Sequence, residues 1–182
     1  MIGKMKMCAR CNLCKNQQPL LDDIKSCQIC WVGLSAKMVK DADEGPLSPT
    51  TNSGRLISEV EENFCGMTTY KTNLVKCVPL DERQKIRYPN NKEIESCFPN
   101  LKEEISELMP RIVFLLGDKV ATAVSKQFNI EFTNWNGFRY AYTEYNGTYY
   151  VPIHHPSYIY VYKRKDIQSY VKGITEIVNQ LV

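Results

Sequence analysis

Residues 70–89 read YKTNLVKCVPLDERQKIRYP, and the fold can be argued outward from this stretch. An apolar run over 71–75 has the composition of a buried strand, and Lys76, Cys77 and a proline follow it closely. The next ten residues contain further basic side chains, at Arg83, Lys85 and Arg87. A buried strand that leads straight into positive charge indicates a binding partner for that charge at the strand's end.

The rest of the chain alternates strands with helices. Four apolar runs are predicted strands, at 28–32, 71–75, 112–116 and 148–153. Four stretches with apolar residues at helical spacing are predicted helices, at 53–64, 99–109, 118–128 and 166–182. This alternation predicts an α/β fold in which one domain spans residues 1–182. Its three α/β/α layers would enclose a mostly parallel, four-stranded sheet. A hairpin over 138–153 is expected to turn at Asn146–Gly147 in the type I′ conformation.

In open parallel sheets, ligands bind outside the carboxyl ends of the strands. Those ends are predicted to carry Gly33 to Ala36, Asn73, Gly117 with Asp118, and the adjacent His154 and His155, which are the only two histidines of the chain. Their placement predicts a functional site. The alternative is structural: one histidine would cap a loop and the other would pack in the interior.

Composition narrows the function classes. The formal net charge of the 182 residues is +3, which is too small to indicate a nucleic-acid partner without local clustering. The sequence has no apolar run of membrane-spanning length and no signal-peptide core, so we expect a monomeric cytoplasmic protein without a membrane partner.

Eight cysteines in such a chain favour metal binding and burial over disulfides. Cys8, Cys11 and Cys14 recur every three residues, a spacing that offers two thiolates to one metal. A zinc-ribbon pattern that adds Cys27 and Cys30 is rejected, because positions three apart on a strand point to opposite faces. We expect these two to be core residues. Cys77 and Cys97 are then the candidate partners of the N-terminal pair, and four thiolates suit either zinc or an iron–sulfur cluster.

Several motifs, in order along nearly the whole chain, are CARCNL (8–13), WVGLSA (31–36), TNLVKCVP (72–79), EIESCFPNL (93–101), IVFLLG (112–117) and HHPSYI (154–159). Together they resemble the uracil-DNA glycosylase superfamily, closest to its branch with four cysteines around a [4Fe–4S] cluster. The resemblance implies a DNA repair enzyme that flips uracil out of DNA and hydrolyses its N-glycosidic bond.

Residue roles follow from this resemblance. The implied cluster ligands are Cys8, Cys11, Cys77 and Cys97, with Cys14 as a rival in the N-terminal group and zinc as the lesser alternative. Asn73 would read the edge of the flipped base, and His155 would stabilise the negative charge that develops on uracil O2. The implied base-binding residues are Gly33, Leu34, Ser35, Leu47 and Asn73.

The partner that the resemblance implies is uracil-containing DNA. Ile159 falls at the position of an apolar wedge that fills the space left by the flipped nucleotide. The other implied DNA contacts are Lys76, Arg83, Ser157, Lys163 and Arg164, so the basic residues after the second strand would hold the DNA backbone.

Two positions depart from the iron–sulfur branch. Leu34 replaces a glutamate that positions water, and Leu47 replaces a phenylalanine that stacks on the base. Asp41 is the predicted catalytic acid in its place, with Asp43 and Glu44 close behind. These departures leave one alternative open: a glycosylase-like protein that binds DNA or a flipped base with little or no excision. If the resemblance is set aside, the chain is instead a metal-stabilised α/β module for a nucleotide or protein partner.

Overall fold

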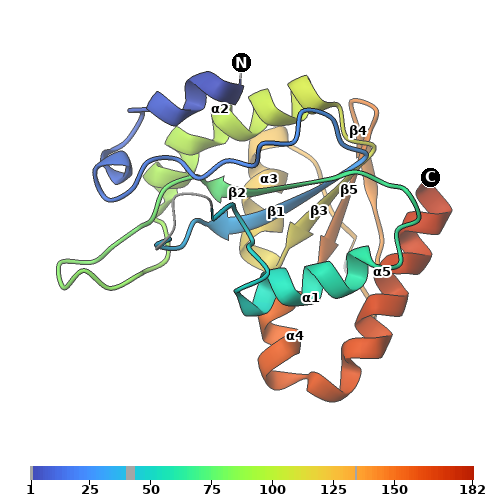
Figure 1. Cartoon of the computed structure of the whole chain (residues 1–182). Coiled ribbons are helices and arrows are strands. Elements are labelled where there is room, and N and C mark those ends of the chain that lie inside the picture. Colours follow the sequence, from blue (N-terminus) through green and yellow to red (C-terminus); the bar gives the residue numbers. More distant parts are fainter. Residues whose placement is uncertain (1, 40–43, 134) are drawn as a thin grey trace.

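The computed structural model describes residues 2–39, 44–133 and 135–182. In this part of the chain, the core is one five-stranded sheet in the order β2-β1-β3-β5-β4 (Figure 1). Its strands are β1 (Ile29–Ser35), β2 (Thr69–Val75), β3 (Ile112–Leu116), β4 (Thr143–Tyr145) and β5 (Thr148–Ile153). The first three and β5 are parallel, which confirms the four predicted strands. The prediction of a four-stranded sheet misses β4, the first arm of the expected hairpin, which adds to β5 as an antiparallel edge strand.

Helices cover both faces of the sheet, so the three predicted layers are confirmed (Figure 1). The helices are α1 (Asn52–Glu61), α2 (Asn91–Leu108), α3 (Asp118–Phe128), α4 (Pro156–Tyr162) and α5 (Ile167–Leu181). Short 3₁₀ turns occur at η1 (Ile2–Met7), η2 (Asn12–Lys15) and η3 (Arg164–Asp166). Apolar side chains of α1, α4 and α5 fill one core, and those of α2 and α3 fill the other.

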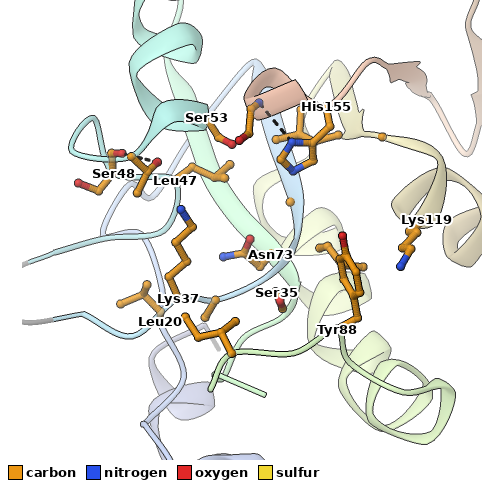
Figure 2. Close-up of a pocket in the computed structure, with 18 of the residues that line it drawn as sticks. Leu20, Ser35, Lys37, Leu47, Ser48, Ser53, Asn73, Tyr88, Lys119 and His155 are labelled. Atoms are coloured by element: carbon orange, nitrogen blue, oxygen red, sulfur yellow. Dashed lines mark hydrogen bonds between the residues drawn. The ribbon is translucent and has the colours of Figure 1, made fainter. Parts of the chain in front are cut away.

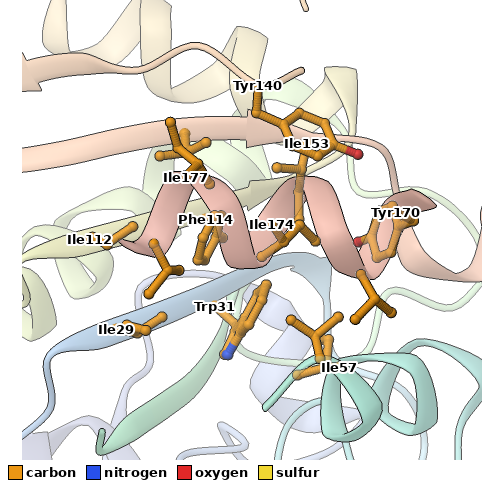
Figure 3. Close-up of a cluster of buried hydrophobic side chains, with 14 of the residues drawn as sticks. Ile29, Trp31, Ile57, Ile112, Phe114, Tyr140, Ile153, Tyr170, Ile174 and Ile177 are labelled. Atoms are coloured by element: carbon orange, nitrogen blue, oxygen red, sulfur yellow. The ribbon is translucent and has the colours of Figure 1, made fainter. Parts of the chain in front are cut away.

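The alternation of side chains along β1 separates these two cores. Ile29 and Trp31 face α1 and α5, whereas Cys30 and Val32 face α2 and α3. The Trp31 ring stacks on Phe114 of the neighbouring strand, with 4.5 Å between ring centroids (Figure 3). Because β1 is buried on both faces, its sequence reads as a continuous apolar run.

The hairpin between β4 and β5 turns as expected. Asn146 and Gly147 have φ angles of 51° and 77°, the left-handed conformation that a type I′ turn needs at both central positions. Asparagine and glycine adopt this conformation at low cost, which is why the dipeptide could be read as a turn.

Helix α2 begins earlier than the sequence prediction. Asn90 caps it by accepting a hydrogen bond from the Glu93 N–H, and the Glu93 carboxylate accepts one from the Asn90 N–H. This capping box starts the helix at Asn91, and Pro99, taken as a helix start, lies inside it. Cys97 therefore sits within α2 and not at its first turn.

Cys27 and Cys30 are buried core residues, as expected. The expectation that they face opposite sides is wrong, because both pack in the core beneath α2 and α3. Cys27 precedes β1, so the strict alternation of a strand does not apply to it.

No helix in the described ranges is long and apolar enough to cross a membrane.

Candidate functional site

A cavity of about 790 Å³ lies at the carboxyl ends of the parallel strands (Figure 2). Its wall includes the ends of β1 and β2, the turn between β3 and α3, and the start of α4. Asn73 and His155 both line it, although they are far apart in the sequence. The predicted meeting of strand ends thus produces a single hollow that holds both residues.

Asn73 reaches this cavity over a glycine. It pairs with Gly33 across the β1–β2 ladder, and a Cβ atom at Gly33 would collide with Oδ1 of Asn73. Asn73 is 3% exposed, and no hydrogen bond within the described residues occupies its side-chain amide. A buried amide that faces a cavity with free donors and an acceptor is suited to a planar ligand of matching polarity.

His155 is held by the first turn of α4. Its Nδ1 accepts a hydrogen bond of 3.2 Å from the Ser157 N–H, so the imidazole caps the helix. Burial lowers the pKa of His155 below its usual value, and the nearby charge of Lys37 lowers it further. A neutral imidazole whose Nδ1 accepts must carry its hydrogen on Nε2, so His155 is a neutral hydrogen-bond donor.

The β3–α3 turn approaches His155 closely. Gly117 has a φ of 89°, a conformation that favours glycine, and a Cβ there would lie 3.2 Å from Cβ of His155. This glycine lets the turn pass beside the imidazole without displacing it.

His154 points away from this site into a cluster of aromatic rings. Its Nε2 accepts from the Trp135 indole N–H at 3.0 Å, and its Nδ1 lies 3.0 Å from the Tyr140 hydroxyl. Burial lowers the pKa of His154 as well. His154 thus packs in the interior, as the structural alternative for the two histidines predicts. His155 caps a helix and also lines the cavity.

The predicted base-binding residues Gly33, Leu34, Ser35 and Leu47 all line the cavity. Leu47 has a φ of 51°, an uncommon conformation for leucine, and a Cβ added at Gly33 would lie 3.2 Å from Leu47 Cδ2. The β1 loop and the segment before α1 thus form an apolar wall beside the Asn73 amide.

The predicted acids have different outcomes. Asp41 and Asp43 lie outside the described residues. Glu44 lines the cavity, and its carboxylate accepts a hydrogen bond of 2.7 Å from the Thr50 hydroxyl.

Lys76 is not available to DNA in this structure, which corrects the sequence prediction. Its side chain is fully buried and its Nζ lies 2.5 Å from Glu104 Oε2. Nζ also donates to the Thr72 hydroxyl at 2.7 Å and to the Asn73 carbonyl at 2.6 Å. A buried charge is stable only with such partners, so Lys76 belongs to the interior framework under Asn73.

Ile159 is also a correction, because it is 1% exposed and packs in the core beside α1 and α5. Ile159 points from α4 into the core, so it does not form the predicted wedge in this structure. Ser157 lines the cavity, and Arg83, Lys163 and Arg164 are exposed. Of the basic residues after β2, Arg87 is engaged internally, since its guanidinium donates to both oxygens of Glu93 at 2.8 and 2.6 Å.

The predicted metal ligands gather around Val75, the last residue of β2. Cys77 and Cys97 are buried together, and Cys11 and Cys14 pack against them. The Asn100 amide donates to Cys8 Sγ at 3.4 Å and to Cys97 Sγ at 3.6 Å, and the Lys76 N–H donates to Cys97 Sγ at 3.4 Å. The fold thus brings the N-terminal cysteines to the two distant ones.

Burial raises the pKa of Cys77 to about 12, and its cysteine neighbours contribute to the rise. The pKa of Cys11 is raised mainly by burial too. Among the described residues, no group of three or more His, Cys, Asp or Glu side chains has a geometry that could hold a metal ion. In this structure the cysteine cluster consists of free thiols, and N–H groups donate hydrogen bonds to the sulfurs of Cys8 and Cys97.

Sequence reasoning missed several residues of the cavity wall, among them Lys37, Tyr88 and Lys119. Lys37 follows the WVGLSA motif directly, and its position two residues after the strand was the available signal. Tyr88 and Lys119 come from separate segments, and the ammonium lies 3.3 Å from the Tyr88 ring centroid (Figure 2). That contact depends on tertiary structure alone.

Comparisons with known proteins found similar chains. Two curated relatives are the type-4 uracil-DNA glycosylases of Archaeoglobus fulgidus and Sulfurisphaera tokodaii. The first is 24% identical over 72% of this chain and 65% of its own length, and the second is 25% identical over 77% and 56%. The matches therefore span less than two thirds of either relative.

The solved structures include a similar fold. The crystal structure of wild-type Pedobacter heparinus SMUG2 matches with a TM-score of 0.55 and 15% identity, over 86% of this chain and 76% of that chain. The family model of the uracil DNA glycosylase superfamily matches residues 17–179. The chain belongs to the uracil DNA glycosylase superfamily.

Proposed function

We propose that this chain excises uracil from DNA by flipping the nucleotide and hydrolysing its N-glycosidic bond. The observation that carries the proposal is the shared cavity of Asn73 and His155, which presents an unoccupied amide and a neutral imidazole donor to one ligand. The names of the two curated relatives support the same activity.

The chemistry follows from the hydrogen-bonding pattern of uracil. The Asn73 amide can donate to uracil O4 and accept from N3–H, a combination that cytosine does not offer. As the bond between C1′ and N1 breaks, the electron pair stays on the base and negative charge grows on O2. The Nε2–H of His155 would donate to that oxygen, and the positive charge of Lys37 near His155 would add to the stabilisation.

Water then adds to C1′ of the sugar, and the proton that it loses neutralises the uracil anion, so the products are free uracil and an abasic site. Asp41 stays the predicted residue that positions this water. Glu44 is the described carboxylate of the same segment, and it lines the cavity. The contacts to the DNA backbone are proposed for Arg83, Ser157, Lys163 and Arg164.

We further propose that Cys8, Cys11, Cys77 and Cys97 hold a [4Fe–4S] cluster. Four thiols suit such a cluster in donor type, and N–H groups donate to two of their sulfurs, those of Cys8 and Cys97. Zinc is the lesser alternative for the same four thiols. When bound, the cluster would supply a cross-link between the N-terminal segment, β2 and α2. The cytoplasmic location and the monomeric state stay predictions.

A second candidate function is DNA or base binding without excision. Leu34 and Leu47 favour it, because both present apolar side chains to the cavity where the iron–sulfur branch has a water-positioning acid and a stacking ring.

The deciding experiment incubates the protein with an oligonucleotide that contains one uracil, then cleaves abasic sites with alkali. Excision is expected for the wild type and is expected to be nearly lost in Asn73→Ala and His155→Ala. Binding of the oligonucleotide without product at excess protein would favour the second candidate.

A further inference from the structure

Helix α4 presents two tyrosines side by side on the rim of the cavity. Tyr158 and Tyr162 both line it, and their ring centroids lie 5.7 Å apart with an interplanar angle of 40°. Their spacing of four residues places them on one face of the helix. Tyr158 is 45% exposed and Tyr162 is 75% exposed, so most of this aromatic surface meets water.

These rings have no structural task within the described chain. Ile159 and Pro156 supply the buried face of α4, and Tyr160 is engaged through its hydroxyl with Arg55. By contrast, neither the Tyr158 nor the Tyr162 hydroxyl makes a hydrogen bond to another described residue. A pair of large aromatic side chains left in water beside a cavity is typical of a binding surface.

The charges around the rings identify the class of ligand. Lys163, Arg164 and Lys165 directly follow the pair and are exposed. On the β2 side of the cavity, the exposed Arg83 and Lys85 lie in the loop that also carries Tyr88, 70% exposed. Proteins hold single-stranded nucleic acid by combining cations that contact the phosphate backbone with aromatic rings on which the bases stack.

The buried position of Ile159 helps to decide whether the protein binds single-stranded or duplex DNA. An apolar wedge is the usual means of holding a duplex open around a flipped nucleotide. Among the described residues of α4, Val161 is an exposed aliphatic side chain, 51% accessible, but it does not line the cavity, whereas Tyr158 and Tyr162 do. An aromatic platform instead needs a base whose face is free, and bases inside a duplex are already stacked on their neighbours.

We propose that Tyr158 and Tyr162 form a stacking platform for the bases next to the flipped uridine, and that the chain prefers uracil in single-stranded DNA. The choice of uracil rests on the proposed function, whereas the platform itself rests on the tyrosine geometry. Each base that stacks on a ring contributes a factor of about 5 to 150 in affinity.

The test measures binding by fluorescence anisotropy with a labelled, uracil-free single strand of about 12 nucleotides, within the usual site size. A duplex of the same sequence is measured in parallel. The wild type is expected to bind the single strand more tightly. Tyr158→Ala and Tyr162→Ala are each expected to weaken single-strand binding about 5- to 150-fold. Tyr158→Phe and Tyr162→Phe should keep the affinity, because the ring and not the hydroxyl does the stacking.

Tyr142→Ala is the matched control, since Tyr142 is an exposed tyrosine, 40% accessible, that does not line the cavity. Its single-strand affinity should equal that of the wild type. Unchanged binding by both alanine variants at α4 would overturn the platform. A wild type that prefers the duplex, with equal losses on both DNA forms in the variants, would make the tyrosines a duplex wedge and overturn the single-strand preference.

Excision assays on the same two DNA forms separate this inference from the proposed function. Tyrosine-dependent single-strand binding without any excision would remove the repair activity and keep the platform. Excision that is unaffected by Tyr158→Ala and Tyr162→Ala on a single strand would keep the activity and remove the platform.

Discussion

Lys76 and Glu104 form an ion pair of 2.5 Å in which both side chains are fully buried. Glu104 also accepts from the Tyr70 hydroxyl at 2.9 Å and from the Thr72 hydroxyl at 3.1 Å. The same lysine donates from Nζ to the Asn73 carbonyl and from its backbone N–H to Cys97 Sγ. One residue therefore touches both the strand end that faces the cavity and the cysteine cluster.

The first prediction concerns this pair. Lys76→Met leaves the Glu104 carboxylate buried without a cation, and we expect a loss of about 3–5 kcal/mol in the free energy of unfolding, measured by urea denaturation. Replacing both partners, as Lys76→Met with Glu104→Leu, should recover part of that loss. The exposed pair of Lys172 and Glu176, 3.8 Å apart, is the control. Lys172→Met should change stability by less than about 1 kcal/mol. Equal effects at the two pairs would contradict a structural role for Lys76.

The second prediction uses the close approach of Gly33 to Asn73. In Gly33→Ala the added methyl collides with the Asn73 amide oxygen, which must rotate away because the backbone around it is fixed. We expect excision to fall about 100-fold, as for a reacting group misplaced by roughly 1 Å, with the circular dichroism spectrum unchanged. Gly3→Ala is the control, since a Cβ at Gly3 meets nothing within 4 Å. Full activity in Gly33→Ala would show that the Asn73 orientation does not matter.

The third prediction concerns pH. The pKa of both histidines is lowered in the folded chain, so the unfolded chain binds more protons once the pH falls below about 6.5. The histidines should thus make stability decrease as the pH falls from about 6.5 towards the lowered values, and they should contribute no slope between about pH 7 and 8. Thermal denaturation at closely spaced pH values measures this slope. His154→Gln and His155→Gln should each reduce it, and a slope that both variants leave intact would assign it to other groups.

The fourth prediction concerns the cysteines. Cys97→Ser is expected to lower the iron and acid-labile sulfide content together with stability, because ligation is coupled to folding. Cys65→Ser is the control, because Cys65 is exposed and outside the cysteine cluster. Cys14→Ser should keep full iron content if Cys8 and Cys11 are the N-terminal ligands. Retention of all iron by Cys97→Ser, or its loss in Cys14→Ser, would change the proposed ligand set.

Much of the fold could be predicted from the sequence because it depends on interactions between residues that are close together in the chain. The strands at 112–116 and 148–153 and the helix at 118–128 have the predicted bounds, because uniform apolar runs and turn residues such as Asn146–Gly147 act over a few neighbours. The early start of α2 was missed because a capping box outweighed the usual reading of Pro99 as a helix start.

The sequence by itself determined the layer order of the fold and the two strand ends that bear Asn73 and His155, since the period of apolar residues and the chemistry of turns are local properties. Only the tertiary structure decided which charged and apolar side chains turn inwards. Lys76 and Ile159 were predicted to face DNA, and both are buried, because partners distant in sequence pack around them. A residue's neighbours in space set the cost of burying it, and a linear sequence does not contain them.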